Sequence, residues 1–340
     1  MKNIIVTGGA GFIGSNFLNE MVIKYPDYNF INLDWLTYAG NTHNLCEISE
    51  KPNYDFCLVD IREIDEIRKV FSIFGNIDGI IHFAAESHVD NSINNPAIFI
   101  ETNINGTFNL LQVAYENWKD DLENHTFYHI STDEVYGSLS LDNDELFTET
   151  TPYAPHSPYS ASKASSDFLV KAFHDTYDMK TLISHCSNNY GPRQHKEKLI
   201  PKIITNVIKG INIPVYGDGK NVRDWLYVSD HVSAIDAIYH NGKSGEVYNI
   251  GGNNEISNID LVYKIIDLID EKLNRFPGYS HNLIEFVEDR KGHDLRYGID
   301  SSKLKNELGW TPSIVDINDG LRKTVDWYFN DFYYIFKACI

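Results

Sequence analysis

Two neighbouring carboxyl groups, Asp133 and Glu134, stand in the stretch ISTDEVYG at residues 130–137. Acids that are buried side by side repel each other as anions, so one tends to stay protonated while the other ionises. Such a pair titrates as a unit and offers an acid and a base at one place. We therefore expect proton-transfer chemistry here, against the alternative of a solvated turn. Thr132 is predicted to hydrogen-bond a substrate oxygen; the alternative for Ser131 and Thr132 is a pair of satisfied strand-end hydroxyls.

A second reactive pair, Tyr159 and Lys163, follows in PYSASKAS. Residues four apart share one face of a helix. An ammonium group near a phenol favours the phenolate and is expected to lower the pKa of the tyrosine from about 10, which makes a usable general base. A Tyr-x-x-x-Lys pair is also common on surface helices, so its significance depends on the motifs around it.

A glycine fingerprint opens the chain. IIVTGGAGFIGSNF places Gly9, Gly11 and Gly14 between a predicted strand and a predicted helix, the arrangement that lets a backbone approach a pyrophosphate. Asp34 ends the next predicted strand, where an acid accepts hydrogen bonds from ribose hydroxyls and repels a 2′-phosphate. The pattern predicts NAD rather than NADP, against a glycine turn with an incidental aspartate. Asp60, at the predicted end of a third strand, is a candidate for the adenine region or a plain helix cap.

The elements that must position these groups alternate along the first half of the chain. Apolar, β-branched runs separated by helical patterns predict a parallel, doubly wound α/β sheet of the Rossmann type. The ligand site of such a sheet lies at the carboxyl ends of its strands. The predicted strands are NIIVTG, NFINLD, DFCLVD, GIIHFAA, FYHIST and TLISHCS, and the predicted helices span 12–25, 62–74, 97–118 and 159–178.

The texture changes near residue 190, where loops become richer in Gly, Pro and Asn. We predict an NAD-binding domain over 1–188, to which the segment around 222–252 returns. A smaller, less regular C-terminal substrate domain spans 189–330, and an aromatic tail of undecided role spans 331–340.

Composition narrows the class of protein. The 340 residues carry a formal net charge of −19, which argues against a nucleic-acid surface but leaves room for a small anionic ligand held by a few cations. No apolar run is long enough for a membrane span, and the N-terminal apolar stretch is too short for a signal peptide. The four cysteines have no metal-binding or redox spacing. A cytoplasmic protein without a metal site is expected.

Ten motifs in order carry a resemblance that runs from Lys2 to about Trp327. The chain resembles the extended short-chain dehydrogenase/reductases and, within them, the dTDP-glucose 4,6-dehydratase family. The motifs are TGGAGFIGSN, LTYAGN, FAAESHVD, STDEVYGS, SPYSASKASSD, CSNNYGP, EKLIP, YGDGKNVRDWLYV, YNIGGNNE and DRKGHDLRYGID.

The resemblance implies a redox-neutral lyase reaction with tightly bound NAD. Tyr159 removes the proton of the sugar 4-hydroxyl while hydride leaves carbon 4 for NAD. Glu134 then takes the proton from carbon 5 and Asp133 protonates the departing 6-hydroxyl. Hydride returns to carbon 6, which yields dTDP-4-keto-6-deoxy-glucose for deoxysugar or polysaccharide biosynthesis.

The same resemblance assigns roles by matching position. The implied catalytic residues are Thr132, Asp133, Glu134, Tyr159 and Lys163. The implied cofactor residues are Gly8, Gly11, Phe12, Ile13, Gly14, Asp34, Thr37, Asp60, Ile61, Ala84, Ala85, Glu86, Thr102, Tyr159, Lys163 and Asn189. The implied substrate residues are Ser87, His88, Thr132, Asn188, Lys198, Leu199, Pro214, Tyr216, Arg223, Asn258, Asp289, Arg290, His293 and Tyr297.

Three departures from the family pattern are Trp35, Asn91 and the loop 193–198 (RQHKEK). Trp35 and Asn91 are expected beside the cofactor. The loop is expected near the nucleotide, where it weakens the preference for thymidine over uridine.

Several alternatives stay open at this stage. UDP-glucose and CDP-glucose are alternative substrates. A UDP-sugar 4-epimerase shares the fold, the NAD and the Tyr/Lys pair but needs no adjacent acids. A catalytically silent NAD-sensing or scaffold protein on the same fold would be expected to have lost Tyr159, Lys163 or the acids. The helices at 97–118 and 159–178 are expected to pair with those of a second copy in a four-helix homodimer interface.

Overall fold

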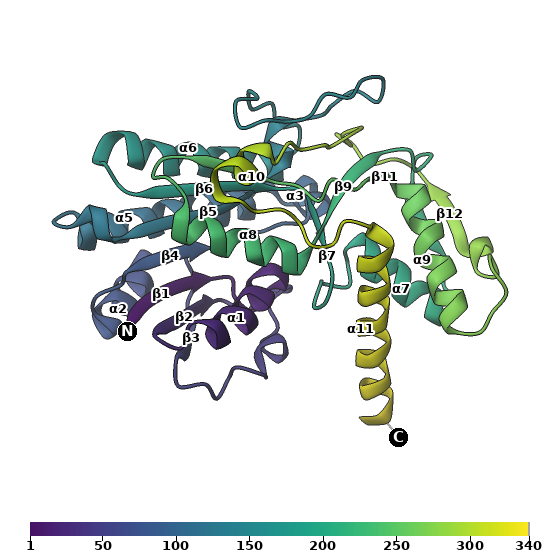
Figure 1. Cartoon of the computed structure of the whole chain (residues 1–340), viewed down its shortest axis with the longest axis horizontal. Coiled ribbons are helices and arrows are strands. Elements are labelled where there is room, and N and C mark those ends of the chain that lie inside the picture. The colour runs from purple at the N-terminus through teal and green to yellow at the C-terminus, as the bar shows by residue number, and fades with distance from the viewer. Residues whose placement is uncertain (339–340) are drawn as a thin grey trace.

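A seven-stranded, wholly parallel sheet forms the centre of the computed structural model, which describes the backbone of residues 1–338 and the side chains of residues 1–330 (Figure 1). The strand order is β10-β6-β5-β4-β1-β2-β3, so the direction of winding reverses between β1 and β4. This arrangement confirms the predicted doubly wound fold. The strands are β1 (Lys2–Thr7), β2 (Tyr28–Asp34), β3 (Tyr54–Leu58), β4 (Gly79–His82), β5 (Thr126–Thr132), β6 (Thr181–Cys186) and β10 (Val247–Ile250).

Helices cover both faces of this sheet. Successive side chains of β1 point to opposite faces: Ile4 and Val6 pack in the cluster formed with α1 and α8, and Ile5 packs in the cluster formed with α2, α5 and α6. Burial on both faces is why the strands read as continuous apolar runs. The covering helices are α1 (Phe12–Lys24), α2 (Ile64–Phe74), α5 (Thr107–Trp118), α6 (Pro158–Tyr177) and α8 (Val228–Asn241).

The helix predicted over 97–118 is not regular, which corrects the sequence-based expectation. After α3 (Val89–Asn94), the chain forms α4 (Pro96–Phe99), a π-helix η2 (Ile100–Gly106) and then α5. Within η2, the Asn103 amide exchanges hydrogen bonds with the backbone N–H and C=O of Glu86, at 2.8 and 3.0 Å, and donates to Ser162 at 2.8 Å. These contacts to remote segments account for the local widening, which is common at functional sites.

A second region packs around its own apolar core. It holds a three-stranded sheet in the order β11-β9-β7 and a parallel pair β12-β8. Its elements are β7 (Asn188–Tyr190), α7 (Leu199–Lys209), β8 (Ile213–Tyr216), β9 (Val222–Tyr227), β11 (Glu255–Ser257), α9 (Asn258–Lys272), β12 (Ile284–Val287) and α11 (Ile317–Ala338). Short elements complete the chain: η1 (Thr42–Leu45), η3 (Leu122–Asn124), η4 (Asp133–Tyr136), η5 (His281–Leu283) and α10 (Ser302–Leu308).

The segment around 222–252 divides between the two regions. β10 joins the central sheet beside β6 and α8 packs on α1, whereas β9 belongs to the second sheet. The division at 188/189 itself stays a prediction. The predicted tail 331–340 lies outside the residues whose side chains are described.

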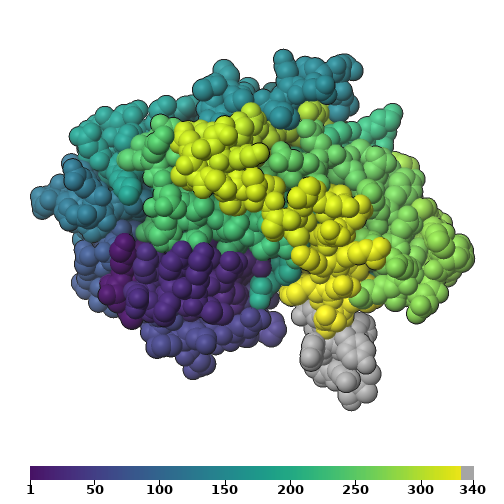
Figure 2. All heavy atoms as spheres, viewed as in Figure 1, coloured from purple at the N-terminus to yellow at the C-terminus, as the bar shows by residue number. Residues whose placement is uncertain are grey.

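The chain after α10 lies across the junction of the two regions and is drawn in yellow in Figure 2. The Trp310 indole N–H donates to Ser233 of α8 at 2.8 Å. Asp230, also on α8, accepts hydrogen bonds from the backbone N–H groups of Ser313 and Ile314. α11 then packs on α9 in the second region. This crossing ties the second region to the helix layer of the central sheet.

Candidate active site

A cavity of about 390 Å³ lies at the carboxyl ends of the central strands. Its walls come from the turns that follow β1, β2, β3, β4, β5 and β6, and from the loop that precedes α7. The reversal of winding between β1 and β4 opens a crevice at this edge, where ligands of doubly wound sheets bind. The position agrees with the expected site.

The turn between β1 and α1 forms one wall by close backbone packing. Gly8 has φ of +71°, and a Cβ there would lie 2.7 Å from the Ala84 backbone. A Cβ on Gly14 would lie 2.4 Å from the Gly8 carbonyl oxygen. Gly11 and Phe12 bring the N-terminus of α1 to the cavity, so its free N–H groups and positive dipole end face the space. This cradle fits a pyrophosphate.

Asp34 sits at the end of β2, buried in the same wall. Its two carboxylate oxygens accept the backbone N–H groups of Ala10 and Leu36, at 2.9 and 2.8 Å. Burial raises the pKa of Asp34, against those two hydrogen bonds. Each oxygen keeps a further lone pair for a ribose hydroxyl. The residues present therefore fit the ribose and pyrophosphate of NAD.

Asp60 differs from expectation in two respects. β3 ends at Leu58, so Asp60 lies beyond the strand, and the N-cap of α2 is Glu63, so the helix-cap alternative is wrong. Asp60 instead pairs with the Arg62 guanidinium through two short contacts, Nε to Oδ2 at 2.9 Å and Nη2 to Oδ2 at 2.6 Å. Arg62, which was not foreseen, also lines the cavity.

The two adjacent acids have different surroundings. Asp133 is 2% exposed, and within the described part of the chain its Oδ2 has no hydrogen-bond partner. Burial and the neighbouring Glu134 raise the pKa of Asp133 well above its usual range. Burial raises the pKa of Glu134 too, but three cations oppose that shift: Arg290, Arg223 and Lys198. The site thus favours the proton on Asp133 and the charge on Glu134.

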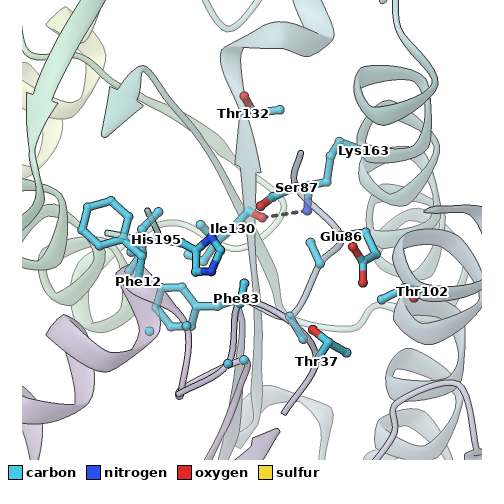
Figure 3. Close-up of a pocket in the computed structure, with 18 of the residues that line it drawn as sticks. Phe12, Thr37, Phe83, Glu86, Ser87, Thr102, Ile130, Thr132, Lys163 and His195 are labelled. Carbon is cyan, nitrogen blue, oxygen red and sulfur yellow. Dashed lines mark hydrogen bonds between the residues drawn. The ribbon is translucent and has the colours of Figure 1, made fainter. Parts of the chain in front are cut away.

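Helix α6 presents Tyr159 and Lys163 on the face that borders the cavity. A capping box between Ser157 and Ser160 starts the helix and holds Tyr159 in its first turn. The Lys163 ammonium donates to the Ile130 carbonyl of β5 at 2.9 Å (Figure 3). Burial lowers the pKa of Lys163 to about 8.

The expected lowering of the pKa of Tyr159 is wrong for this structure. Burial and the charge of Glu134 raise the pKa of Tyr159 well above its usual range. The Lys163 ammonium is directed to a backbone carbonyl of β5, and its charge does not offset the burial of the phenol. Sequence spacing places the two groups on one face but does not set their separation or their solvation.

The structure gathers the predicted catalytic and cofactor residues around this one cavity. Every one of them lines it, Thr132 included, as do three further predicted substrate residues, namely Ser87, Asn188 and Lys198. The other predicted substrate residues lie outside the lining: His88, Leu199, Pro214, Tyr216, Arg223, Asn258, Asp289, Arg290, His293 and Tyr297.

Part of this second set is joined through Asp90, a residue that the sequence did not single out. The Tyr216 hydroxyl donates to Asp90 at 3.2 Å, and Arg290 Nη1 lies 3.8 Å from the same carboxylate. His293 contacts Asp289 at 2.6 Å and packs edge-on against Tyr216. Because Asp90 belongs to α3, it links the turn after β4 to the second region.

Arg223, one of the predicted substrate residues, is buried beside the acids. Its guanidinium donates to the carbonyls of Val222 and Asp294, at 2.7 and 2.9 Å, and lies 4.1 Å over the Tyr297 ring. Its contact with the substrate stays a prediction.

The loop 193–198 holds residues that the residue assignments missed. Gln194, His195 and Glu197 line the cavity, and His195 packs edge-on against Tyr38 from the loop after β2. In Figure 3, His195 lies beside Phe12. The sequence signal for these residues was the departure of the loop from the family pattern. That departure was interpreted as a loop near the nucleotide. Trp35 also lines the cavity, as expected, but Asn91 does not.

Comparison with known proteins agrees with the resemblance carried by the sequence motifs. The family model for GDP-mannose 4,6 dehydratase matches residues 5–324. A dTDP-glucose 4,6-dehydratase of Salmonella typhimurium is 50% identical over 336 residues, which cover 96% of this chain and 92% of that protein.

Solved structures of dTDP-glucose 4,6-dehydratases are also similar to this chain over nearly its whole length. The dTDP-glucose 4,6-dehydratase of Bacillus anthracis in complex with NAD has a TM-score of 0.85 and 44% identity, and covers 97% of each chain. The Streptomyces venezuelae dTDP-glucose 4,6-dehydratase, also with NAD bound, has a TM-score of 0.88 and 42% identity, and covers 98% of each chain.

Proposed function

The chain belongs to the dTDP-glucose 4,6-dehydratase family of the extended short-chain dehydrogenase/reductases, and on that premise we propose that it dehydrates dTDP-glucose to dTDP-4-keto-6-deoxy-glucose. It acts as a hydro-lyase with NAD as its cofactor. The observation that carries the proposal is the unequal environment of Asp133 and Glu134 beside Tyr159 and Lys163 in one cavity.

NAD, when bound, supplies a reversible hydride acceptor. The turn at Gly8–Gly14 and the N-terminus of α1 would hold its pyrophosphate, and Asp34 would hold a ribose. The remaining chemistry is proton transfer by the side chains of this chain.

Tyr159 accepts the proton of the sugar 4-hydroxyl, and the Thr132 hydroxyl orients that oxygen. Burial and Glu134 raise the pKa of Tyr159, so Tyr159 can act as the base only where positive charge near the ring favours the phenolate. Lys163, one helical turn further along α6, can supply part of this positive charge.

The two acids carry out the loss of water. Once carbon 4 is a ketone, the hydrogen on carbon 5 is acidic, and Glu134, whose charge Arg290 and Arg223 favour, takes it. Asp133, which holds its proton, delivers it to the departing 6-hydroxyl. As carbon 6 is reduced, Glu134 returns its proton to carbon 5. In one turnover Tyr159 therefore gains a proton and Asp133 loses one, so a proton must pass from the phenol, directly or through solvent, back to Asp133.

The test uses purified protein without added NAD. Incubation with dTDP-glucose, UDP-glucose and CDP-glucose in parallel, followed by the alkaline absorbance of 4-keto-6-deoxy products, should give product with dTDP-glucose. Product only with UDP-glucose or CDP-glucose would change the assigned base. Inversion at carbon 4 without loss of water would replace the dehydratase by a 4-epimerase.

We further infer that a second copy of the chain is the protein partner. The outer faces of η2, α5 and α6 expose large apolar side chains, among them Ile100 at 52%, Phe108 at 41% and Phe168 at 60%. Exposed large apolar side chains on neighbouring helices favour an interface. A four-helix interface between two copies would cover it.

The structure provides one observation that bears on the location of the protein in the cell. Among the described residues, no helix is long and apolar enough to cross a membrane. The cytoplasmic location stays a prediction from the sequence.

A further inference from the structure

A third ionisable residue, Asp167, lies behind the catalytic pair. Tyr159, Lys163 and Asp167 follow one another at four-residue intervals on α6, so they share one face of the helix. Asp167 is 1% exposed and does not line the cavity, and the proposed reaction does not use it. A carboxylate so deeply buried is costly unless it is hydrogen-bonded and paired with a cation.

Groups on two strands of the central sheet hold this carboxylate. Ser131 of β5 donates to Asp167 Oδ2 at 3.0 Å, and His185 Nε2 of β6 lies 3.1 Å from the same oxygen. His129 Nε2, also on β5, lies 3.4 Å from Asp167 Oδ1. The same His129 nitrogen lies 3.2 Å from Lys163 Nζ. His129 therefore stands between the carboxylate and the catalytic ammonium.

Among the described groups that face Lys163, Asp167 is the one that provides a negative charge. Burial lowers the pKa of Lys163 to about 8, and Asp167 is the first of the groups that oppose this shift, ahead of Cys186 on β6. Burial lowers the pKa of His129 to about 4, and burial lowers the pKa of His82 on β4 well below its usual range, so both imidazoles are neutral near pH 7.

Asp167 itself remains ionised. Burial would raise the pKa of Asp167, but the two imidazoles that face it, His129 and His185, outweigh burial and hold that pKa below the usual range. The other groups that face it are the phenols of Tyr136 and Tyr153, whose pKa values burial raises, so they are uncharged. The cluster thus contains one buried anion, Asp167, and one buried cation, Lys163.

We propose that Asp167 is a positioning residue that keeps Lys163 in its ammonium form, with His129 aligned between them. The proposal rests on the proposed function for its consequence in catalysis, because Lys163 supplies the positive charge beside Tyr159. Asp167 touches neither the cavity nor the reacting atoms, so it acts only through Lys163.

The test measures the protonation of Lys163 directly. In protein labelled with ¹³C at lysine Cε, the Lys163 signal is identified by its loss in Lys163→Arg, and its midpoint is followed by NMR as the pH rises. Asp167→Asn should lower this midpoint by about one pH unit or more, the size of shift that a nearby opposite charge causes. The alkaline limb of kcat with dTDP-glucose should move down by the same amount, because the neutral amine is the inactive form.

Two controls separate charge from structure. Asp167→Glu keeps the charge and should leave the midpoint within a few tenths of a unit of wild type. Asp270→Asn removes an equally buried carboxylate that is bonded to Ser280 in the second region, and should leave the midpoint unchanged. If Asp167→Asn does not fold, Asp167→Ser also removes the charge, and the same lower midpoint is expected.

The outcomes separate this proposal from the proposed function. An unchanged Lys163 midpoint in a folded, charge-free variant overturns the role of Asp167, even if wild type converts dTDP-glucose. A lowered midpoint in a protein that converts none of the three sugar nucleotides leaves the Asp167–Lys163 pairing intact and overturns the proposed function instead.

Discussion

At the scale of single residues, chemistry depends on how differently two neighbours in the sequence are surrounded. Asp133 lines the cavity but is 2% exposed, and its Oδ1 accepts the Thr132 hydroxyl at 3.3 Å. Glu134 faces the cavity and the cations of the second region. One acid is therefore suited to give a proton and the other to take one.

Glu134→Gln separates the two halves of the reaction. Without its carboxylate the protein should still oxidise carbon 4, but product formation should fall by about 100-fold or more, the usual contribution of a general base. Reduced nicotinamide should accumulate, as read by its absorbance, while alkaline product absorbance stays low. Glu145→Gln, on an exposed loop nearby, is the matched control and should behave as wild type. Normal turnover by Glu134→Gln would show that another group takes the carbon-5 proton.

Asp133→Asn tests the buried acid through stability. Because the folded pKa of Asp133 is raised, its contribution to stability is present below the unfolded pKa of about 4 and is lost as the pH rises through the folded value. At pH 7 the variant should therefore unfold with a free energy about 1–2 kcal/mol higher than wild type, and the gain should shrink toward pH 4. Urea unfolding at both pH values measures the difference.

Asp270→Asn gives the contrast, since it removes a carboxylate whose oxygens accept two hydrogen bonds from Ser280 and should lose stability at pH 7. A loss of stability in both variants at pH 7 would mean that Asp133 is ionised and paired in the folded protein.

At the scale of elements, the turn between β1 and α1 must both pack closely against neighbouring backbone and leave room for the cofactor. Gly8 takes a positive φ and packs on Ala84 at the end of β4, which brings two carboxyl-end turns into contact. The π-helix η2 likewise connects two segments, because Asn103 hydrogen-bonds both to the turn after β4 and to Ser162 of α6. Both devices place irregular backbone where segments converge on the cavity.

Gly8→Ala should therefore do more than strain one residue. Gly75 is the matched control, since it has the same φ of +71°, but a Cβ at that position would meet no atom within 4 Å. Gly75→Ala should lower the free energy of unfolding by about 1–3 kcal/mol, the cost of a backbone conformation that alanine rarely adopts. Gly8→Ala should lower it by at least about 1 kcal/mol more, because of the 2.7 Å contact, and should lose NAD from the purified protein. Equal losses of stability and of NAD in both variants would remove the role assigned to the close approach at Ala84.

At the scale of the whole molecule, two features extend beyond the cavity. The crossing of 310–314 over α8 and the contacts of Asp90 join the second region to the central sheet at separate points. The apolar faces of η2, α5 and α6 lie on the surface of the single chain.

The proposed interface gives a prediction at this scale. Phe168→Glu places a charge on the outer face of α6, where Phe168 is 60% exposed, and should shift the protein from dimer to monomer at micromolar concentration in sedimentation. Phe276→Glu, at a site that is 67% exposed in the second region, should leave the dimer intact. A wild-type protein that sediments only as a monomer would contradict the interface.

Local patterns in the sequence determined most of the fold. Six strands, the helices around them and the glycine turn each depend on neighbours within a few residues, so composition and period were sufficient. The motif order also brought all the predicted catalytic and cofactor residues to one cavity, because consecutive parallel strands end at the same edge of a sheet. The regular helix over 97–118 was wrong because Asn103 bonds to Glu86 and Ser162, which lie far along the chain.

Only the tertiary structure decided the electrostatics of the site. Arg223 lowers the pKa of both acids, whereas Arg290, from a segment about 155 residues away in the chain, lowers the pKa of Glu134 and so favours the proton on Asp133. The raised pKa of Tyr159 and the counter-charge of Lys163 depend in the same way on burial and on the contacts of β5 and β6. A sequence determines which ionisable groups a protein has, but their protonation depends on the solvent they lose and the charges they meet, and folding sets both.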